Sequence, residues 1–190
     1  MERDLFFGLE EYFKERYSGW EGAEQFEGTG ERLQRAYDEL CWPIKEIEKQ
    51  LEKCFEKVFN DGYSEMLVSG PNTVWTLCPH HLLPCKFLVT IGYIPTGKVL
   101  GLSKFTRVAD ILARRPIMQE TYSRELADII MARLLPEGVG VSVLGHHGCM
   151  GARGVKQEVP VTTAVLRGSF LNDTDVRAEW NHRLDREAKV

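Results

Sequence analysis

Hydrophobic residues recur three and four positions apart over residues 44–58, with Lys or Glu at most of the positions between them. The apolar positions are Ile44, Ile47, Leu51, Phe55 and Val58. This spacing collects the apolar side chains on one face and predicts an amphipathic helix. Pro43 is compatible with a first helical turn, and Asn60-Asp61-Gly62 provides a stop at the other end. We predict that this helix closes a helical N-terminal region.

The period of the hydrophobic pattern changes to two from Phe87 onwards. Apolar side chains at alternate positions from Phe87 to Tyr93 predict a strand. Pro95-Thr96-Gly97 then provides a turn before Val99, and together these features predict a β-hairpin. Two earlier extended segments are expected on either side of a turn at Gly70-Pro71-Asn72: residues 63–68 and 74–77.

Two helices and two further strands complete the pattern. Pro116 separates the helices, and the second strand is rich in Val and Thr. The expected ranges are 104–114 and 121–135 for the helices and 139–144 and 159–170 for the strands. The order ββααββ behind N-terminal helices indicates an α+β fold. We divide the chain into a helical region at 1–62, a domain at 63–172 that holds the predicted sheet, and a helical tail at 173–190.

The composition is that of an ordinary globular protein, with 190 residues of which 43% are hydrophobic and 27% charged. No apolar run approaches the roughly 20 residues of a membrane-spanning helix, and the N-terminus is acidic where a signal peptide is basic. We therefore expect a cytoplasmic protein without a membrane partner. The net charge of -4 argues against a nucleic-acid partner. Five cysteines, an odd number, favour free thiols or a metal site in a reducing compartment.

The charge is unevenly distributed along the chain. Residues 1–60 hold fifteen acidic and nine basic side chains, whereas residues 86–115 hold six basic side chains and one acidic one, Asp110. The basic segment can face an anionic small molecule. The alternative is a solvated face without a partner.

Cysteine and histidine side chains gather in two places, each directly after a predicted strand. These are Cys78-Pro79-His80-His81, with Cys85 nearby, and His146-His147-Gly148-Cys149. Thiolate and imidazole ligands together suit zinc. Eight side chains are candidates on this basis: the five cysteines with His80, His81 and His147.

Two kinds of zinc site are compatible with these residues. A catalytic zinc keeps one coordination position open for water and uses three protein ligands, which leaves histidines free to move protons. A closed site of Cys78, Cys85, Cys149 and one histidine would only stabilise the fold. Buried core cysteines and hydrogen-bonded histidines without any metal are the third possibility.

Two further segments have the chemistry of a nucleotide site. Gly101 to Arg107 joins a strand to a helix, and Ser103, Lys104 and Arg107 there can meet phosphate, to which Arg153 can add a cation. The Glu120 carboxylate, next to Gln119, can accept the two parallel N–H groups that guanine presents. Ordinary turn residues and a solvated helix start are the respective alternatives.

Four motifs in this order resemble GTP cyclohydrolase I over about residues 75–170: CPHHLLP, GYIPTGKVLGLSKFTRV, RRPIMQE and HGCMGARGV. The segment GTGERLQRAYDEL at 28–40 resembles the family's upstream helix more loosely. The resemblance implies the tunnelling fold, an antiparallel sheet with helices on one face. It also implies a homodecamer of two stacked pentamers with active sites between subunits.

The resemblance also implies roles for individual residues. Cys78, His81 and Cys149 would bind zinc, and His80 and His147 would transfer protons. Ser103, Lys104, Arg107 and Arg153 would contact ribose and triphosphate, Gln119 and Glu120 the guanine ring, and Arg32 a phosphate. The implied reaction is hydrolysis of GTP at C8 with release of formate and rearrangement to 7,8-dihydroneopterin triphosphate.

The chain departs from the family's usual pattern at four places. Pro79 replaces a common Glu, Cys85 replaces an aromatic or aliphatic residue, His146 adds an imidazole, and Thr29-Gly30 replaces Thr-Pro. One alternative is therefore a related cyclohydrolase that acts on a modified purine nucleotide or releases a ring-opened product. Another is a non-catalytic zinc or nucleotide-binding protein in which Cys85 closes the metal shell.

Overall fold

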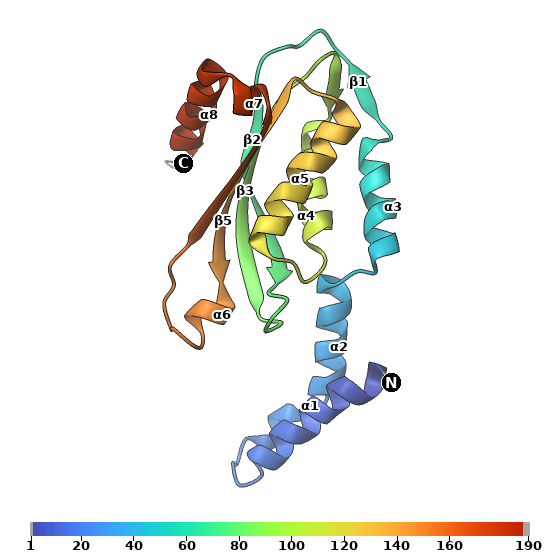
Figure 1. Ribbon diagram of the computed structural model, residues 1–190. Helices are drawn as coiled ribbons and strands as arrows, with labels where there is room; N and C mark the ends of the chain where they lie inside the picture. Colours follow the sequence, from blue (N-terminus) through green and yellow to red (C-terminus); the bar gives the residue numbers. More distant parts are fainter. Residues whose placement is uncertain (1, 188–190) are drawn as a thin grey trace. The chain divides into compact units, whose positions relative to one another are not determined.

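The computed structural model describes residues 2–187, and the chain divides into two compact units, residues 1–42 and 43–190. Figure 1 shows the elements of both units, coloured along the sequence. Between residues 2 and 187, no helix has the length and apolar character needed to cross a membrane. The last three residues of the predicted C-terminal tail lie outside the described residues.

The first unit consists of the helix α1 (Glu2–Arg16), a short 3-10 helix η1 (Ala23–Phe26) and the helix α2 (Thr29–Leu40). The rings of Phe13, Tyr17 and Phe26 stack at centroid distances of 5.7 to 6.3 Å and hold η1 against α1. This aromatic packing supplies the apolar contacts of a unit that has few fully buried residues.

Glu10 joins α1 to the start of α2. Its carboxylate accepts hydrogen bonds from the backbone N–H groups of Gly28 at 3.2 Å and Gly30 at 2.8 Å, and lies 2.8 Å from Nζ of Lys14. The first N–H groups of a helix have no partner within the helix, so an external carboxylate stabilises this end. A proline at position 30 would lack the N–H that Glu10 binds. The contact with Glu10 therefore requires a residue other than proline at position 30.

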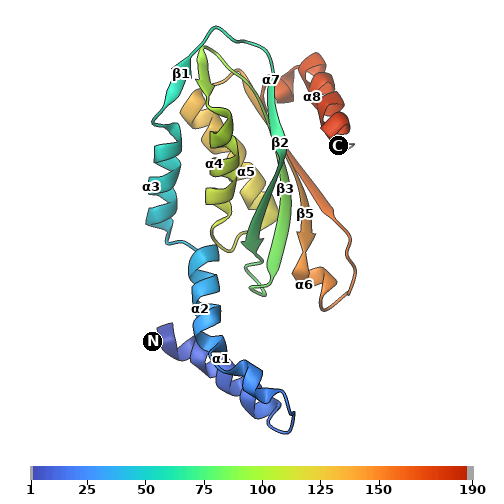
Figure 2. The ribbon, with the colours of Figure 1, turned by 180° about the vertical axis from the view of Figure 1, so that it is seen from behind.

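The second unit is built on a four-stranded antiparallel sheet in the order β2-β3-β5-β6. The strands are β2 (Leu67–Leu77), β3 (Pro84–Ile94), β5 (Gly138–His147) and β6 (Val161–Gly168). The helices α4 (Leu102–Ala113) and α5 (Gln119–Leu134) cover one face of this sheet, and α3 (Ile44–Phe55) packs against α4 (Figures 1 and 2). The predicted α+β class and the order ββααββ are confirmed.

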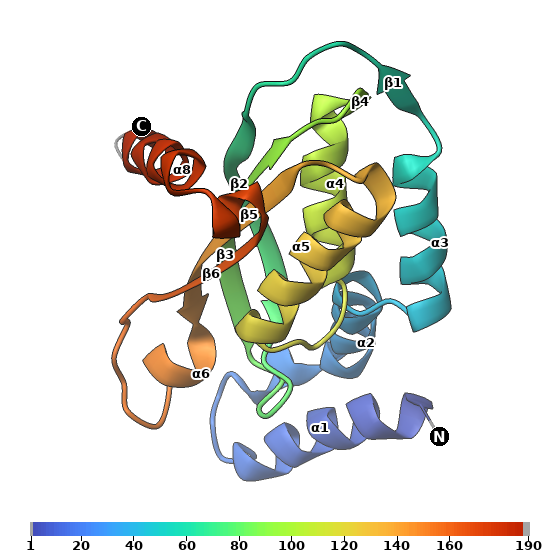
Figure 3. The ribbon, with the colours of Figure 1, turned by 45° about the horizontal axis from the view of Figure 1, so that its top comes forward.

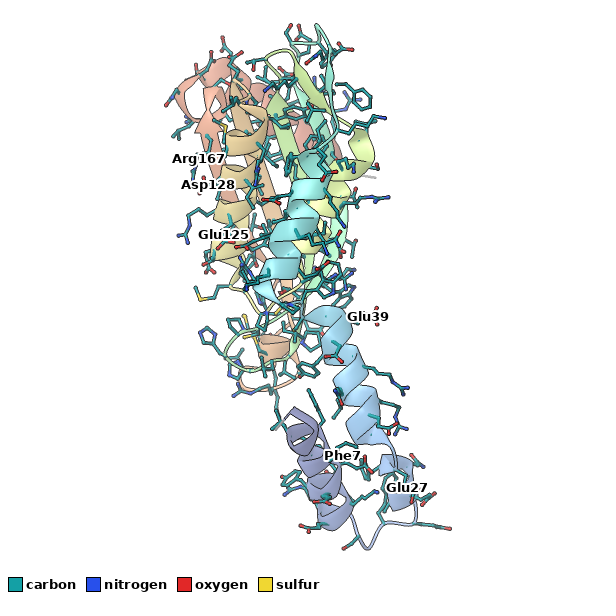
Figure 4. All side chains as sticks on the ribbon, turned by 90° about the vertical axis from the view of Figure 1, so that its right-hand side faces the viewer. Phe7, Glu27, Glu39, Glu125, Asp128 and Arg167 are labelled. Carbon is teal, nitrogen blue, oxygen red and sulfur yellow. The ribbon has the colours of Figure 1, made fainter. Side chains whose placement is uncertain are left out.

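Apolar side chains of the strands and helices form the core between the sheet and this helical layer. From the sheet come Phe87, Val89, Ile91, Tyr93, Val139, Val141 and Val143, and from the helices Phe105, Val108, Leu112, Tyr122, Leu126 and Ile130, all buried. Alternate residues of β3 thus point to the helices, as the period of two predicts. At the edge of the layer, Arg167 of β6 pairs with Asp128 of α5 at 2.9 Å (Figure 4).

A second helical element packs against the opposite face of the sheet. The short helix α7 (Ser169–Asn172) leads into α8 (Thr174–Glu187) (Figure 3). Phe170 and Trp180 from these helices are buried against β3 and β5. Gly92 and Gly140 make room for them, because a Cβ at either position would come within 2.6 Å of a Trp180 or Phe170 ring carbon. Helices therefore contact both faces of the sheet, rather than one alone.

The prediction of a hairpin across residues 95–97 is wrong. The strand β4 (Lys98–Leu100) pairs with β1 (Val58–Asn60) in a separate two-stranded sheet and not with β3. Val58, expected in the helix of residues 44–58, belongs to β1. The predicted turn at residues 70–72 is instead an irregularity within the continuous strand β2, where the register shifts between Ser69 and Asn72. A bulge of this kind keeps the strand paired while accommodating Gly-Pro.

Strand register brings several chain segments to one edge of the sheet. The end of β2 at Leu77, the start of β3 at Pro84 and the end of β5 at His147 lie side by side, because Leu77 pairs with Pro84 and Cys85 with His147. The backbone N–H of Ile117 donates to the carbonyl of Leu77 at 3.1 Å and holds the start of α5 at the same edge. The candidate site lies here.

Candidate metal centre and active site

Cys78, His81 and Cys149 form a cluster whose ligand atoms all lie within 4.8 Å of one another. Cys78 directly follows β2, His81 lies in the following turn, and Cys149 lies in the one-turn helix α6 (Gly148–Gly151) after β5. The turn is held by hydrogen bonds from the Cys78 N–H to the Leu83 carbonyl at 2.9 Å and from the Leu82 N–H to the Cys78 carbonyl at 2.8 Å. Two strand ends therefore present the cluster.

The donor set of this cluster fits a zinc ion. Two thiols and one imidazole are ligands that zinc prefers, and their spacing allows one ion to contact all three. Burial and the adjacent Cys78 thiol raise the pKa of the Cys149 thiol, whereas Arg153 lowers it. A bound cation would remove the cost of bringing two thiolates together.

Cys85 does not belong to this cluster. Its side chain is almost completely buried, and its Sγ lies 3.3 Å from Nδ1 of His147. Burial raises the pKa of the Cys85 thiol to about 12, and the neighbouring Cys149 and Cys78 add to the rise. Among the described residues, the ligand atoms close enough together for one ion are those of Cys78, His81 and Cys149, which disfavours the closed four-ligand arrangement that includes Cys85.

His147 has partners on both ring nitrogens. Its Nε2 lies 2.8 Å from Oε1 of Gln119, opposite the contact of Nδ1 with Cys85. Burial lowers the pKa of His147, and the nearby Glu120 carboxylate partly offsets this effect. The ring of Phe87 meets the imidazole edge to face at 5.8 Å. His147 is thus held in one orientation from several sides.

Gln119 is buried and its amide is fully engaged within the chain. Its Nε2 donates to the carbonyl oxygens of Val143 at 3.0 Å and Val161 at 2.9 Å, which lie on the strands β5 and β6. The family resemblance implies a contact between Gln119 and the guanine ring. Its side chain turns to the sheet and to His147, whereas Glu120 is exposed at the first turn of α5.

A cavity of about 250 Å³ adjoins the cluster. Its lining includes Cys78, Pro79, His80, Cys85, Ile117, Met118, Gln119, Glu120, His147 and Cys149. His80 is exposed, and its Nδ1 lies 3.8 Å from Sγ of Cys78. The His80 imidazole, the Glu120 carboxylate and residues of the candidate metal cluster therefore line the same cavity. General acid–base chemistry on a bound ring needs such groups close to the reacting atoms.

A second cavity of about 330 Å³ lies on the other side of His147. Trp75, Lys86 and His146, which are register neighbours on the face away from α4 and α5, contribute to its lining. Sequence reasoning did not assign Trp75 or Lys86 to a site. The alternation of side-chain direction along β3 could have predicted this placement. Lys86 precedes Phe87, so its side chain lies on the opposite face of the sheet from Phe87.

The end of the sheet where Cys78, His81 and Cys149 meet is called the metal edge below. The residues predicted to bind phosphate do not lie at the metal edge of their own chain. The first turns of α4 hold Ser103, Lys104 and Arg107. The segment that follows the other end of α4 reaches the metal edge. There, the Arg115 carbonyl accepts a hydrogen bond from the Thr76 hydroxyl at 2.7 Å. Twelve residues of helix span about 18 Å. Two groups of predicted site residues are thus separated by the length of α4.

The two remaining predicted phosphate ligands lie elsewhere. Arg153 is exposed and follows α6 closely enough to affect the pKa of Cys149. Arg32 belongs to the first unit, where its guanidinium donates to Oγ1 of Thr29 at 2.9 Å and to the Gln25 carbonyl at 3.3 Å. The metal edge of a single chain therefore combines the cluster, His80, Glu120 and Arg153.

Two solved structures match part of this chain at low sequence identity. The apo structure of the archaeosine synthase QueF-Like matches with a TM-score of 0.45 and 23% identity and covers 57% of this chain and 96% of that one. The E. coli dihydroneopterin aldolase in complex with neopterin matches with a TM-score of 0.43 and 15% identity and covers 55% and 99%.

Sequence comparison gives much stronger matches. The GTP cyclohydrolase 1 of Corynebacterium glutamicum (strain R) is 38% identical over 154 residues, which cover 80% of this chain and 77% of the relative. The GTP cyclohydrolase 1 of Pelotomaculum thermopropionicum is 38% identical over 158 residues, which cover 82% of each chain. The sequence model of GTP cyclohydrolase I matches residues 18–185, a range that includes the metal cluster and every predicted site residue. This chain belongs to the GTP cyclohydrolase I family, and its sheet and helices have the tunnelling fold of that family.

Proposed function

We propose that this protein is a zinc-dependent GTP cyclohydrolase. It hydrolyses GTP at C8, releases that carbon as formate and rearranges the remainder to 7,8-dihydroneopterin triphosphate. The observation that carries the proposal is the cluster of Cys78, His81 and Cys149 beside a cavity lined by His80 and Glu120. The relatives named GTP cyclohydrolase 1 support GTP as the substrate.

Cys78, His81 and Cys149 hold the zinc ion in this proposal. When bound through three protein ligands, zinc supplies a Lewis acid that activates water near neutral pH. Cys85 stays outside the metal shell because its thiol is engaged by His147. The protein therefore contributes two thiolates and one imidazole and leaves a coordination position free for chemistry.

The remaining residues orient the purine and move protons. Glu120, exposed at the start of α5, accepts the N1 and N2 hydrogens of guanine. His80 exchanges a proton with the imidazole ring of the purine, since it is exposed in the same cavity as the cluster. His147 is the second proton-transfer residue, and Gln119 supports it through the contact with Nε2. Holding the base at one end places the reacting carbon beside the metal.

The triphosphate contacts come from more than one chain. Arg153 lies near the metal cluster of its own chain, but Ser103, Lys104 and Arg107 are a helix length away. Lys104 and Arg107 therefore serve the site of a neighbouring copy, and Arg32 adds a further phosphate contact. This separation supports a homo-oligomer with active sites between subunits, and the family resemblance implies a decamer of two pentamers.

Turnover of GTP by the zinc-loaded protein tests the activity. The expected products are formate and a pterin that becomes fluorescent after oxidation, in equal amounts. Cys149→Ala should lose both zinc and turnover, whereas Cys41→Ala, which removes a thiol from the end of α2 in the first unit, should keep both. A zinc-loaded wild-type protein that yields neither product contradicts the proposal.

Pro79 favours a second candidate function. It lines the cavity where the family commonly has Glu, so the cavity lacks one carboxylate and one backbone N–H. A cyclohydrolase for a modified purine nucleotide, or one that releases a ring-opened product, fits this change. Mass spectrometry of products from a panel of purine nucleoside triphosphates separates the candidates, because the main proposal requires GTP to be the best substrate and the pterin triphosphate to be the product.

A further inference from the structure

Cys85 and His147 lie directly opposite each other on the strands β3 and β5. Opposite residues of an antiparallel pair project from the same face, with Cβ atoms about 5 Å apart. This face is the one covered by α4 and α5, and Cys85 is only 1% exposed there. The register of two strands, rather than a flexible loop, therefore sets the 3.3 Å contact between the thiol and Nδ1 of His147.

The hydrogen bonds of Gln119 determine which ring nitrogen of His147 carries the hydrogen. Two backbone carbonyls, those of Val143 and Val161, face the same amide atom, and a carbonyl can only accept. That atom is consequently the nitrogen, and the amide oxygen is the atom 2.8 Å from Nε2 of His147. An amide oxygen also only accepts, so Nε2 must donate. Nδ1 of a neutral ring is then an acceptor.

We infer that Cys85 is a positioning residue for His147. Its thiol donates to Nδ1 at 3.3 Å rather than to the more distant Leu83 carbonyl at 3.8 Å, and it holds the imidazole in the tautomer with its hydrogen on Nε2. This role rests on the proposed function, in which His147 transfers a proton. With Nδ1 occupied by the thiol, the ring hydrogen lies on Nε2, which donates it to Oε1 of Gln119. Cys85 thus acts on the reaction through His147, and its sulfur is not among the three clustered ligand atoms.

The surroundings leave the ring few alternatives. Phe87, two residues after Cys85 on the same face, packs against the imidazole, so a water molecule is a poor replacement for the thiol. Gly145 lies opposite Phe87, and a Cβ at this position would overlap Oε1 of Gln119. Three positions on two strands therefore combine to hold His147 between a thiol donor and an amide acceptor.

Cys85→Ala and Cys85→Ser form a matched pair for testing the role, since they differ by one hydroxyl. Loss of one hydrogen bond in Cys85→Ala should lower kcat for GTP about threefold to tenfold, with KM within about twofold of the wild-type value. Cys85→Ser restores a donor and should recover about half of wild-type kcat or more. Cys41→Ala, which removes a thiol at the end of α2 in the first unit, should leave kcat unchanged.

Zinc content and ring spectroscopy give readouts that do not depend on turnover. Zinc per chain should be the same in wild type and Cys85→Ala; loss of zinc would make Cys85 a ligand and overturn the inference. Nitrogen-15 NMR of the zinc-bound protein, labelled at its five histidines, should show His147 with its hydrogen on Nε2 and a hydrogen-bonded Nδ1. The His147→Gln variant identifies the signals. Cys85→Ala should shift the Nδ1 signal.

Distinct results contradict the two proposals. Wild-type protein that binds zinc but forms no formate from GTP contradicts the proposed function. If wild-type protein is active and Cys85→Ala has the same kcat, the result contradicts only the inferred role of Cys85. A His147 ring with its hydrogen on Nδ1, or with hydrogens on both nitrogens, contradicts the inferred tautomer.

Discussion

The amide oxygen of Gln119 lies 2.8 Å from Nε2 of His147, and the amide nitrogen of the same side chain is bound to carbonyls of two strands. A residue at the first position of α5 therefore joins the helix to β5, β6 and the imidazole. The contact makes the geometry of His147 depend on packing between the helical layer and the sheet. Substitutions that alter this packing should affect turnover without touching the metal.

Gly145→Ala is predicted to displace Gln119 from His147. An added Cβ would overlap Oε1 of Gln119 and approach Nε2 of His147 to 3.0 Å, so the amide must move. Overpacking of this kind costs about 1–3 kcal/mol of stability. We expect a lower melting temperature and a lower kcat at unchanged zinc content. Gly62→Ala is the control, because a Cβ there meets nothing within 4 Å. Equal behaviour of the two variants would contradict the packing argument.

Glu120→Gln is predicted to weaken the selection of guanine. The change keeps the shape of the side chain but replaces an acceptor oxygen by an N–H₂ group that opposes the N–H groups of guanine. Loss of a charged hydrogen-bond partner should raise KM for GTP about tenfold or more, with a smaller effect on kcat. Steady-state kinetics with GTP measures both. Glu48→Gln, an exposed position on α3, should change neither, and an unaltered KM in Glu120→Gln would exclude the assigned contact.

Mixed oligomers are predicted to regain activity from two inactive variants. Arg107→Ala lacks a proposed phosphate contact at the start of α4, and Cys149→Ala lacks a proposed metal ligand in α6. If one site takes these residues from different chains, equal mixing should leave about a quarter of the sites intact. The test is to unfold, mix and refold the two variants and then assay formate. Recovery no greater than the sum of the separate variants would place both residues in the same chain's site.

The Glu10 contact is predicted to make the first unit sensitive to acid. The Lys14 side chain and then the Gly30 N–H hold the pKa of this carboxyl below its ordinary value of 4.5. A depressed pKa contributes stability that is present above the unfolded value and is lost as the pH falls through the folded value. The helices of residues 2–40 should therefore melt at a lower temperature in acid, as followed by circular dichroism.

Glu10→Gln separates this contribution from general acid denaturation. The variant keeps an acceptor oxygen but cannot titrate, so its melting temperature should be lower than that of wild type at pH 7 and nearly equal to it in acid. Glu11→Gln is the neighbouring control on α1, where the side chain is exposed. A constant difference between Glu10→Gln and wild type at all pH values would show that titration of Glu10 has no part in stability.

Local sequence was sufficient to predict several elements and the metal cluster. The periodicity of residues 44–58 predicts a helix and that of Phe87 to Tyr93 a strand, because side-chain spacing follows backbone geometry. The helices predicted at 104–114 and 121–135 agree with α4 and α5 to within a few residues. Motifs in a fixed order pointed to Cys78, His81 and Cys149, and these three residues meet in the structure.

Local sequence could not predict which strands pair when they lie far apart in the chain. A turn at residues 95–97 predicts a hairpin, yet β4 pairs with β1, some forty residues earlier, because hydrogen bonding along a strand edge depends on which segment the fold brings beside it. The same holds for Cys85, which sequence reasoning could place either in the metal shell or outside it. The Cys85 thiol contacts His147 because the register of β3 and β5 places the two residues opposite each other.

The sequence by itself determined the family, the residue types of the metal centre and the α+β order, since these depend on motifs and on periodicity along one chain. Tertiary structure decided which partners these side chains have. Gln119 contacts the sheet and His147, and Cys85 contacts His147 and lies outside the candidate metal cluster. Lys104 and Arg107 lie a helix length from that cluster. The physical reason is that a buried polar group takes whichever partner the packing of distant segments provides.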